Sequence, residues 1–316
     1  MLDTLSKTTG NDAQRAFLTE AFANAQTLTN LAQGMANQHQ NLNADQVFDW
    51  LYGTENADLM RGRLRQTLGG IWQSTIPVEG ELRGGGALTA DVRVFCTHDR
   101  LREGRARANG EKRLFDPAWT ILPDDEDQDQ PDTIQICPWF LDYAMQQKAQ
   151  FRGQFKPGKI ATMITKLKLD RLATWVAYTP VDLFQLFDKV IVHELSHTRA
   201  GGQLDDVGGF SGYGWKNCRR LSTNRGDDGP HRNADTVALF TSICGLIGEN
   251  GMVHEDGTFV RGPGADGGEG DDDEGGETKR RALILDENGE PIVEPPALEK
   301  RVWQFNAASL KGRPLF

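Results

Sequence analysis

Residues 179 to 197 read TPVDLFQLFDKVIVHELSH and end in a His-Glu-x-x-His pattern formed by His193, Glu194 and His197. Residues four apart lie one above the other on a helix, so the two imidazoles can bind one metal ion. Zinc accepts two neutral imidazoles and a further protein ligand, and it keeps one position for water. The pattern therefore predicts a zinc site with Glu194 beside the water rather than on the metal.

The residues that surround the pattern predict a helix over positions 179 to 199. Thr179 is a suitable N-cap, Pro180 suits the first helical position, and Asp182 completes a capping-box pattern. Apolar residues recur at helical steps, at Val181, Phe184, Phe187, Val190, Ile191 and Leu195. The glycines at 201 and 202 predict its end. The alternative is a chance match whose histidines only hydrogen-bond in a core.

Length and composition indicate a globular protein with an acidic extension. The chain has 316 residues, 38% of them hydrophobic, which is enough for a large core. Residues 250 to 316 hold 14 acidic against 8 basic residues of a chain whose net charge is -10. No apolar run approaches the ~20 residues of a membrane span, and no basic patch is concentrated. We therefore expect neither a membrane nor a nucleic acid as partner.

Patterns along the chain predict an α+β fold that is mainly helical. Helical periodicity marks residues 11–33 and 43–74, with Gly69 and Gly70 interrupting the second stretch, so the first 75 residues are expected to be helical. Alternating residues at 91–96 and 133–137 predict a small sheet. The acidic loop at 124–127 and the basic stretch at 148–171 are expected to be solvated. Residues 1–249 should form the catalytic domain and 250–316 a largely disordered tail.

The four cysteines leave two interpretations open. They are widely spaced and include no C-x-x-C pair, so a structural zinc site is not indicated. Two disulfides would suit a secreted enzyme, and their order suggests Cys96 with Cys137 and Cys218 with Cys244. The alternative is four reduced, buried cysteines. The first ten residues show no apolar segment of a secretory signal.

A catalytic zinc ion requires a third protein ligand, and the sequence removes some candidates. A histidine six residues after His197 is excluded, because position 203 is Gln203. No glutamate lies between Glu194 and Glu249, and Glu249 stands at the edge of the glycine-rich tail. A third histidine of that kind is therefore ruled out, and a glutamate is disfavoured.

Two candidates remain for the third ligand. His231 lies in a Gly-Pro-His loop, whereas the anionic pair Asp205 and Asp206 lies nearer, in the glycine-rich loop after the predicted helix. Another aspartate, Asp235, opens a predicted helix from Asn233. It either orients a zinc-bound histidine or caps that helix.

Residues 185 to 245 resemble the deuterolysin-type zinc metalloendopeptidases, or aspzincins, which include fungal lysine-specific metalloendopeptidases. The resemblance rests on HELSH, on a following loop with Asp205-Asp206 and then Tyr213-Gly-Trp, and on NADTVALF from Asn233. The family signature continues with G-T-x-D-x-x-Y-G. In this chain Gln203-Leu204 replaces Gly-Thr, and six residues instead of two separate Asp206 from Tyr213.

The resemblance implies a zincin-like domain with one catalytic Zn²⁺ held by His193, His197 and Asp206. Glu194 would be the general base, and Tyr213 would assist the transition state. Protein or peptide substrates are implied, with a preference for lysine that an acidic pocket would explain; Asp227 and Asp228 are candidates but equally suit a solvated loop. An extracellular monomer is expected.

Two alternative functions remain. The first is a zinc-binding or zinc-scavenging protein without turnover, and the second is a structural domain with an accidental motif.

Overall fold

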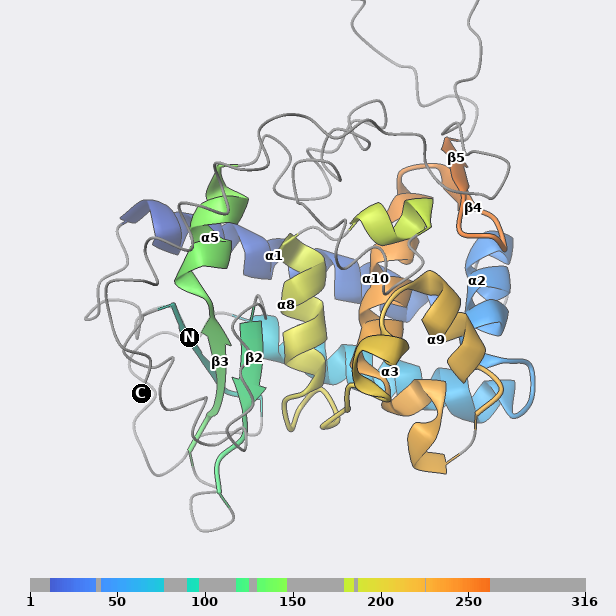
Figure 1. Ribbon diagram of the computed structural model, residues 1–316, viewed down its shortest axis with the longest axis horizontal. Helices are drawn as coiled ribbons and strands as arrows, with labels where there is room; N and C mark the ends of the chain where they lie inside the picture. The colour runs from blue at the N-terminus through green and yellow to red at the C-terminus, as the bar shows by residue number, and fades with distance from the viewer. Residues whose placement is uncertain are drawn as a thin grey trace, which may run out of the picture. The chain divides into compact units, whose positions relative to one another are not determined.

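The helix with the His-Glu-x-x-His pattern, α8 (Phe187–Ser196), packs against other helices and against an edge strand of a small sheet (Figure 1). The computed structural model describes residues 12–37, 41–76, 90–96, 118–124, 130–146, 179–184, 187–224 and 226–261. All of them belong to one compact unit. The predicted class is confirmed: the fold is α+β and mainly helical, with a small sheet beside the motif helix.

Three further helices build the core around α8. They are α1 (Asp12–Met35), α3 (Ala57–Thr75) and α10 (Ala234–Gly248), and α1 packs against all the others. Residues 234 to 247 of α10 are all buried, because this helix carries apolar or small residues on every side. Helices α2 (Leu42–Tyr52) and α9 (Trp215–Leu221) pack on each other and on α10.

The sheet has three strands in the order β1-β3-β2. The central strand β3 (Asp132–Ile136) is parallel to β1 (Val92–Phe95) and antiparallel to β2 (Ala118–Ile121), with Thr120 opposite Ile134. Helix α5 (Pro138–Met145) follows β3 directly. Strands β1 and β3 coincide with the predicted stretches. Strand β2 was not predicted, although it is the strand that contacts α8.

The predicted helix over 179–199 is wrong in its extent. Residues Pro180–Phe184 form a 3-10 helix, η5, and α8 begins at Phe187 and ends at Ser196. The capping pattern is present in part, because Asp182 Oδ2 accepts a hydrogen bond from the Thr179 N–H at 2.7 Å. His197 follows α8 in a turn, and the His197 N–H donates a hydrogen bond to the Glu194 carbonyl at 3.2 Å.

The interruption predicted at Gly69 and Gly70 is also wrong, because α3 continues through both to Thr75. A Cβ atom on Gly70 would stand 1.7 Å from the carbonyl oxygen of Ala200, in the turn that follows α8. The absence of a side chain at Gly70 therefore allows two backbone segments to approach closely, and it does not break the helix.

The disulfide pairing suggested by the order of the cysteines is wrong. Cys96, Cys137, Cys218 and Cys244 are all free and buried. The Cys218 thiol lies 3.3 Å from the carbonyl oxygen of Gly212, beneath the loop that follows α8. The alternative of four reduced, buried thiols therefore describes this structure.

Beyond α10 the chain forms a hairpin of β4 (Gly251–Val253) and β5 (Phe259–Arg261), past the boundary predicted near 250. The Asn43 side chain of α2 exchanges two hydrogen bonds with the backbone of Val253, and the Gly257 carbonyl accepts from the Val181 N–H. The remainder of the predicted tail, residues 125–127 of the acidic loop and the basic stretch at 148–171 lie outside the described residues.

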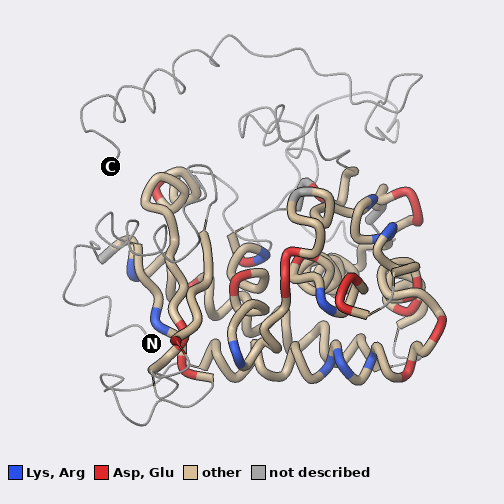
Figure 2. The backbone as a smooth tube through the Cα atoms, turned by 60° about the horizontal axis from the view of Figure 1, so that its bottom comes forward, with Lys and Arg blue, Asp and Glu red and all other residues tan. Residues whose placement is uncertain are grey.

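Charges of both signs are interspersed along the described part of the chain (Figure 2). Among the helices that the structure describes, none combines the length and the apolar character needed to cross a membrane.

Candidate metal centre

Three predicted ligands converge at the end of α8. The Nε2 atoms of His193 and His197 lie 3.2 Å apart, and Asp206 Oδ1 lies 3.3 Å from the first and 3.5 Å from the second. In the part of the chain that the structure describes, these are the acidic, histidine and cysteine side chains that group tightly enough to hold a metal ion.

The spacing of these three atoms suits a zinc ion. Ligand atoms about 2.0–2.1 Å from a tetrahedral zinc stand about 3.3 Å from one another. Asp206 Oδ1 is buried and makes no hydrogen bond, although it faces two imidazole nitrogens. Three electron-pair donors at such distances repel unless a proton or a cation lies among them. The donor set of two nitrogens and one oxygen is one that zinc accepts.

The loop after α8 separates the roles of the two adjacent aspartates. Asp205 pairs through its backbone with Arg232 and Ala234, and its side chain, 62% exposed, forms an ion pair with Arg232 at 2.6 Å. Successive residues of an extended segment point to opposite sides. Asp206 is therefore directed toward the histidines while Asp205 faces solvent.

The chain fixes the tautomer of His197. Its Nδ1 lies 2.6 Å from the carbonyl oxygen of Leu204, which accepts only if Nδ1 carries the proton. The lone pair of Nε2 is then available toward Asp206 and His193. A backbone carbonyl behind a metal-binding histidine is a common support for such a ligand.

Behind His193 lies a buried ion pair that the sequence did not predict. Asp235 Oδ1 stands 3.8 Å from His193 Nδ1 and 3.1 Å from the ammonium of Lys189, which lies one turn earlier on α8. Burial alone would raise the pKa of Asp235, but the charges of Lys189 and His193 lower it. The Asp235 side chain accepts a hydrogen bond from the Gly214 N–H at 2.8 Å and pairs with Lys189, so of its two predicted roles the structure favours the one beside His193.

Glu194 is buried beside the three ligands. Its Oε2 atom lies 2.9 Å from the hydroxyl of Thr120 on strand β2, which also lies 2.8 Å from the Glu194 carbonyl oxygen. Burial raises the pKa of Glu194, although the charges of His193 and His197 and the Thr120 hydrogen bond oppose that rise. A carboxylate with a raised pKa is better suited to accept and return a proton near neutral pH.

Tyr213 reaches the centre despite the longer loop. Its ring stacks on that of His193, with centroids 5.6 Å apart and planes at 25°. Burial and the negative charges of Asp206 and Asp235 raise the pKa of its phenol, so the hydroxyl stays protonated.

Asn233 explains how the insertion is accommodated. Its side chain accepts a hydrogen bond from the Val207 N–H at 3.1 Å and donates to the Gly212 carbonyl at 2.9 Å. These two residues are the first and last of the six that separate Asp206 from Tyr213. Because one amide closes the loop, its extra length does not move Tyr213 away from the centre.

The other candidates lie elsewhere. His231 and Glu249 are not among the side chains that converge with His193. Asp227 and Asp228, proposed as an acidic pocket for lysine, are exposed on a 3-10 helix, η7 (Gly226–Asp228).

No protein-family model matches the chain, and no curated protein matches it. Among solved structures, the chain is similar to a zinc peptidase from Grifola frondosa, with 12% sequence identity and a TM-score of 0.39. The similarity covers 74% of this chain and 96% of that one.

Proposed function

We propose that this protein is a zinc-dependent metalloendopeptidase. The observation that carries the proposal is the convergence of His193, His197 and Asp206 at 3.2–3.5 Å beside the buried carboxylate of Glu194. Three ligands and an adjacent base are what metal-assisted hydrolysis of a peptide bond requires.

Each residue has a distinct task in this reaction. A Zn²⁺ ion bound by the three ligands would supply Lewis-acid activation of water and of the scissile carbonyl. Glu194 accepts the proton of the attacking water and delivers it to the leaving amine, and Thr120 holds its carboxylate in place. The Tyr213 hydroxyl, which stays protonated, donates a hydrogen bond to the oxygen that becomes negative.

Lysine-directed cleavage, implied by the resemblance, stays a prediction. It requires an acidic group that can meet a substrate ammonium. Asp227 and Asp228 are exposed, and the buried carboxylate of Asp235 already pairs with Lys189. We likewise retain a monomer that acts outside the cell as a proposal, which a size measurement and localisation of the protein would test.

The decisive experiment compares metal content and cleavage in matched variants. Wild type should bind one zinc ion and cleave casein or a peptide library unless a chelator is present. Asp206→Ala should lower zinc affinity by more than ~100-fold, because it removes a ligand rather than a supporting group. Asp205→Ala is the control, since it removes the neighbouring carboxylate that faces solvent.

A second variant separates catalysis from binding. Glu194→Gln should keep zinc while cleavage falls by about 10²–10⁴-fold, because the base is lost and the ligands remain. Full activity of this variant would refute the mechanism. Stoichiometric zinc without cleavage by wild type would favour the alternative, a zinc-binding or zinc-scavenging protein, and absence of zinc would leave only a structural domain.

A further inference from the structure

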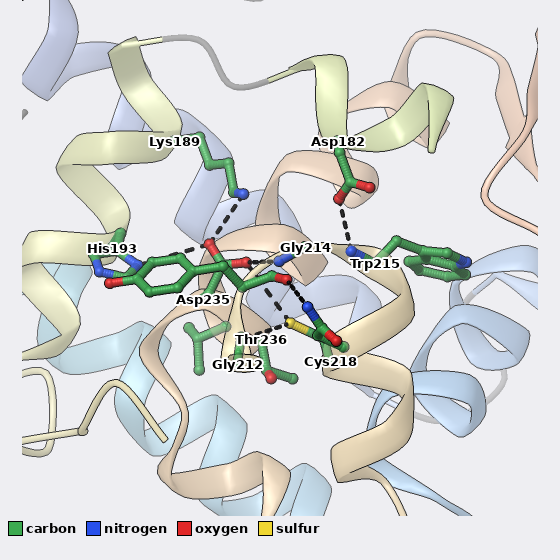
Figure 3. A network of polar contacts seen from close by, with 12 residues as sticks. Asp182, Lys189, His193, Gly212, Gly214, Trp215, Cys218, Asp235 and Thr236 are labelled. Atoms are coloured by element: carbon green, nitrogen blue, oxygen red, sulfur yellow. Dashed lines mark hydrogen bonds and ion pairs between the residues drawn. The ribbon is translucent and has the colours of Figure 1, made fainter. Parts of the chain in front are cut away.

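A cluster of buried charges lies behind the candidate centre (Figure 3). Lys189 and Asp235 are each only 5% exposed and form an ion pair at 3.1 Å. The charge of Lys189 also acts on Asp182, which is 1% exposed and lies in η5.

Asp235 connects this cluster to a predicted metal ligand. Its Oδ1 atom stands between the ammonium of Lys189 at 3.1 Å and Nδ1 of His193 at 3.8 Å. Its Oδ2 atom accepts a hydrogen bond from the Gly214 N–H at 2.8 Å. The carboxylate is therefore held at both oxygens, and its position limits how the His193 ring can turn.

Asp182 binds the backbone next to Gly214. Its Oδ1 atom accepts from the Trp215 N–H at 2.6 Å, and its Oδ2 atom accepts from Thr179. The two carboxylates therefore receive the N–H groups of two consecutive residues, Gly214 and Trp215. Gly214 has φ +82°, a conformation that favours glycine, so the chain makes a defined turn here.

These two N–H groups immediately follow Tyr213, whose ring stacks on His193. Fixing the backbone at 214 and 215 fixes where the Tyr213 side chain starts. The imidazole of His193 is thereby bounded by the Tyr213 ring on its face and by Asp235 at its Nδ1 edge.

Lys189 is the residue on which this arrangement depends. Its ammonium lies 3.1 Å from Asp235 Oδ1, and burying an unpaired charge costs far more than a hydrogen bond returns. A neutral side chain at position 189 would leave the Asp235 carboxylate without this partner, so the carboxylate would turn toward water. That turn would release the Gly214 N–H beside Tyr213 and the Nδ1 edge of His193.

We propose that Lys189 is a positioning residue of the metal centre, which acts through Asp235 to fix His193 and Tyr213. The inference deepens the proposed function, since it concerns the same site.

The test is Lys189→Met, which keeps the length of the side chain and removes its charge. Zinc affinity, measured by competition with a chromogenic chelator, should fall by about 10–100-fold, as when other supports of metal ligands are lost. Lys216→Met is the matched control, because Lys216 is exposed on α9. Unchanged affinity in a folded Lys189→Met variant would overturn the proposal.

A double-mutant cycle distinguishes positioning from general destabilisation. If Lys189 acts through Asp235, the variant Lys189→Met with Asp235→Asn should lose little more affinity than Asp235→Asn alone. If the losses of zinc affinity in the two single variants multiply in the double variant, the two residues act independently and the proposed route is refuted. Should Lys189→Met not fold, Asp235→Asn alone must still weaken zinc binding by about tenfold, since it alters the same support.

A measurement without metal keeps this inference separate from the proposed function. In metal-free protein with labelled histidine, the stacked Tyr213 ring shifts the His193 resonances, and Lys189→Met should move them toward the values of an exposed histidine. Lys216→Met should not. If wild type binds no zinc, the peptidase proposal fails, but the His193 resonances still decide whether Lys189 positions His193. Unchanged His193 resonances in Lys189→Met would refute the role of Lys189.

Discussion

The Thr120 hydroxyl on strand β2 lies 2.9 Å from Glu194 Oε2 and 2.8 Å from the Glu194 carbonyl oxygen. A hydroxyl has one proton to donate, and both acceptors belong to the same residue. The contact joins the sheet to the motif helix at the proposed general base. Thr120 therefore restricts where the Glu194 carboxylate can point.

Thr120→Val should lower kcat for peptide cleavage by about 10–100-fold, because Glu194 loses the hydrogen bond that orients it. Zinc stoichiometry should not change, since the three ligands are untouched. Steady-state kinetics with metal analysis checks both points. Thr133→Val on the neighbouring strand β3 is the control, and equal kinetics in the two variants would contradict a role for Thr120.

Gly70→Ala should destabilise the protein by about 2–3 kcal/mol, because the added methyl group would overlap the Ala200 carbonyl and force α3 away from α8. Gly62→Ala on the same helix meets no atom within 4 Å. It should stabilise the protein by about 0.5–1 kcal/mol through helix propensity. Urea unfolding measures both. The same sign for the two changes would show that the close approach is absent.

The metal-free protein should lose stability between pH 6.5 and about 9. Burial alone would lower the pKa of His197, but Asp206 and Glu194 outweigh it and raise that pKa from 6.5 to about 9. The folded pKa exceeds the unfolded one, so this stabilisation is fully present below pH 6.5 and is lost as the pH rises through 9.

The expected loss is on the order of 1–3 kcal/mol, which denaturant unfolding in the presence of a chelator would detect. Asp206→Asn is the control and should flatten the profile, because it removes the main partner of the protonated imidazole. A wild-type profile as flat as that of Asp206→Asn would contradict the prediction. Bound zinc should also abolish the fall, since zinc takes the neutral imidazole.

Deleting residues 208 to 211 should leave the centre in place. Val207 and Gly212 are already joined by the Asn233 side chain, and a Cβ on Gly212 would stand 2.0 Å from the Val207 carbonyl oxygen. Zinc affinity should stay within about threefold of wild type, because shortening a closed loop changes little.

The effect of Tyr213 on the His193 resonances should also persist in the deletion variant. Asn233→Ala is the contrast, since it removes the group that closes the loop and leaves the Val207 N–H without its acceptor. It should destabilise the protein by about 1–3 kcal/mol. Loss of zinc binding on deletion would show that the loop itself supports the ligands.

Local patterns in the sequence predicted what depends on local structure. The four-residue spacing of His193 and His197 placed their Nε2 atoms together even though α8 ends one residue before His197. Periodicity located α1 for the same reason. The sequence left His231 and two neighbouring aspartates as candidates for the third ligand. The structure brings Asp206 to the two histidines, and the backbone pairing of Asp205 explains why Asp205 faces solvent instead.

Contacts between distant segments could not be predicted in this way. Thr120 meets a residue 74 positions away, on a strand of four residues too short to give a clear alternation. Gly70 was read as a helix break, because a glycine that admits another backbone looks the same in sequence. The sequence gives only the number of residues between Asp206 and Tyr213. Their distance in space is set by Asn233, which holds together the two ends of the segment between them.

The hairpin of β4 and β5 limits where the chain can be cut. Its backbone carbonyls at Val253, Glu255 and Gly257 accept hydrogen bonds from Asn43, Trp215 and Val181, in three separate segments. A recombinant fragment that stops at residue 249 would leave all three donors without these acceptors. The shortest fragment suitable for crystallisation or activity assays should therefore extend at least to Arg261, and a protease that cuts within the hairpin should release metal before it degrades the core.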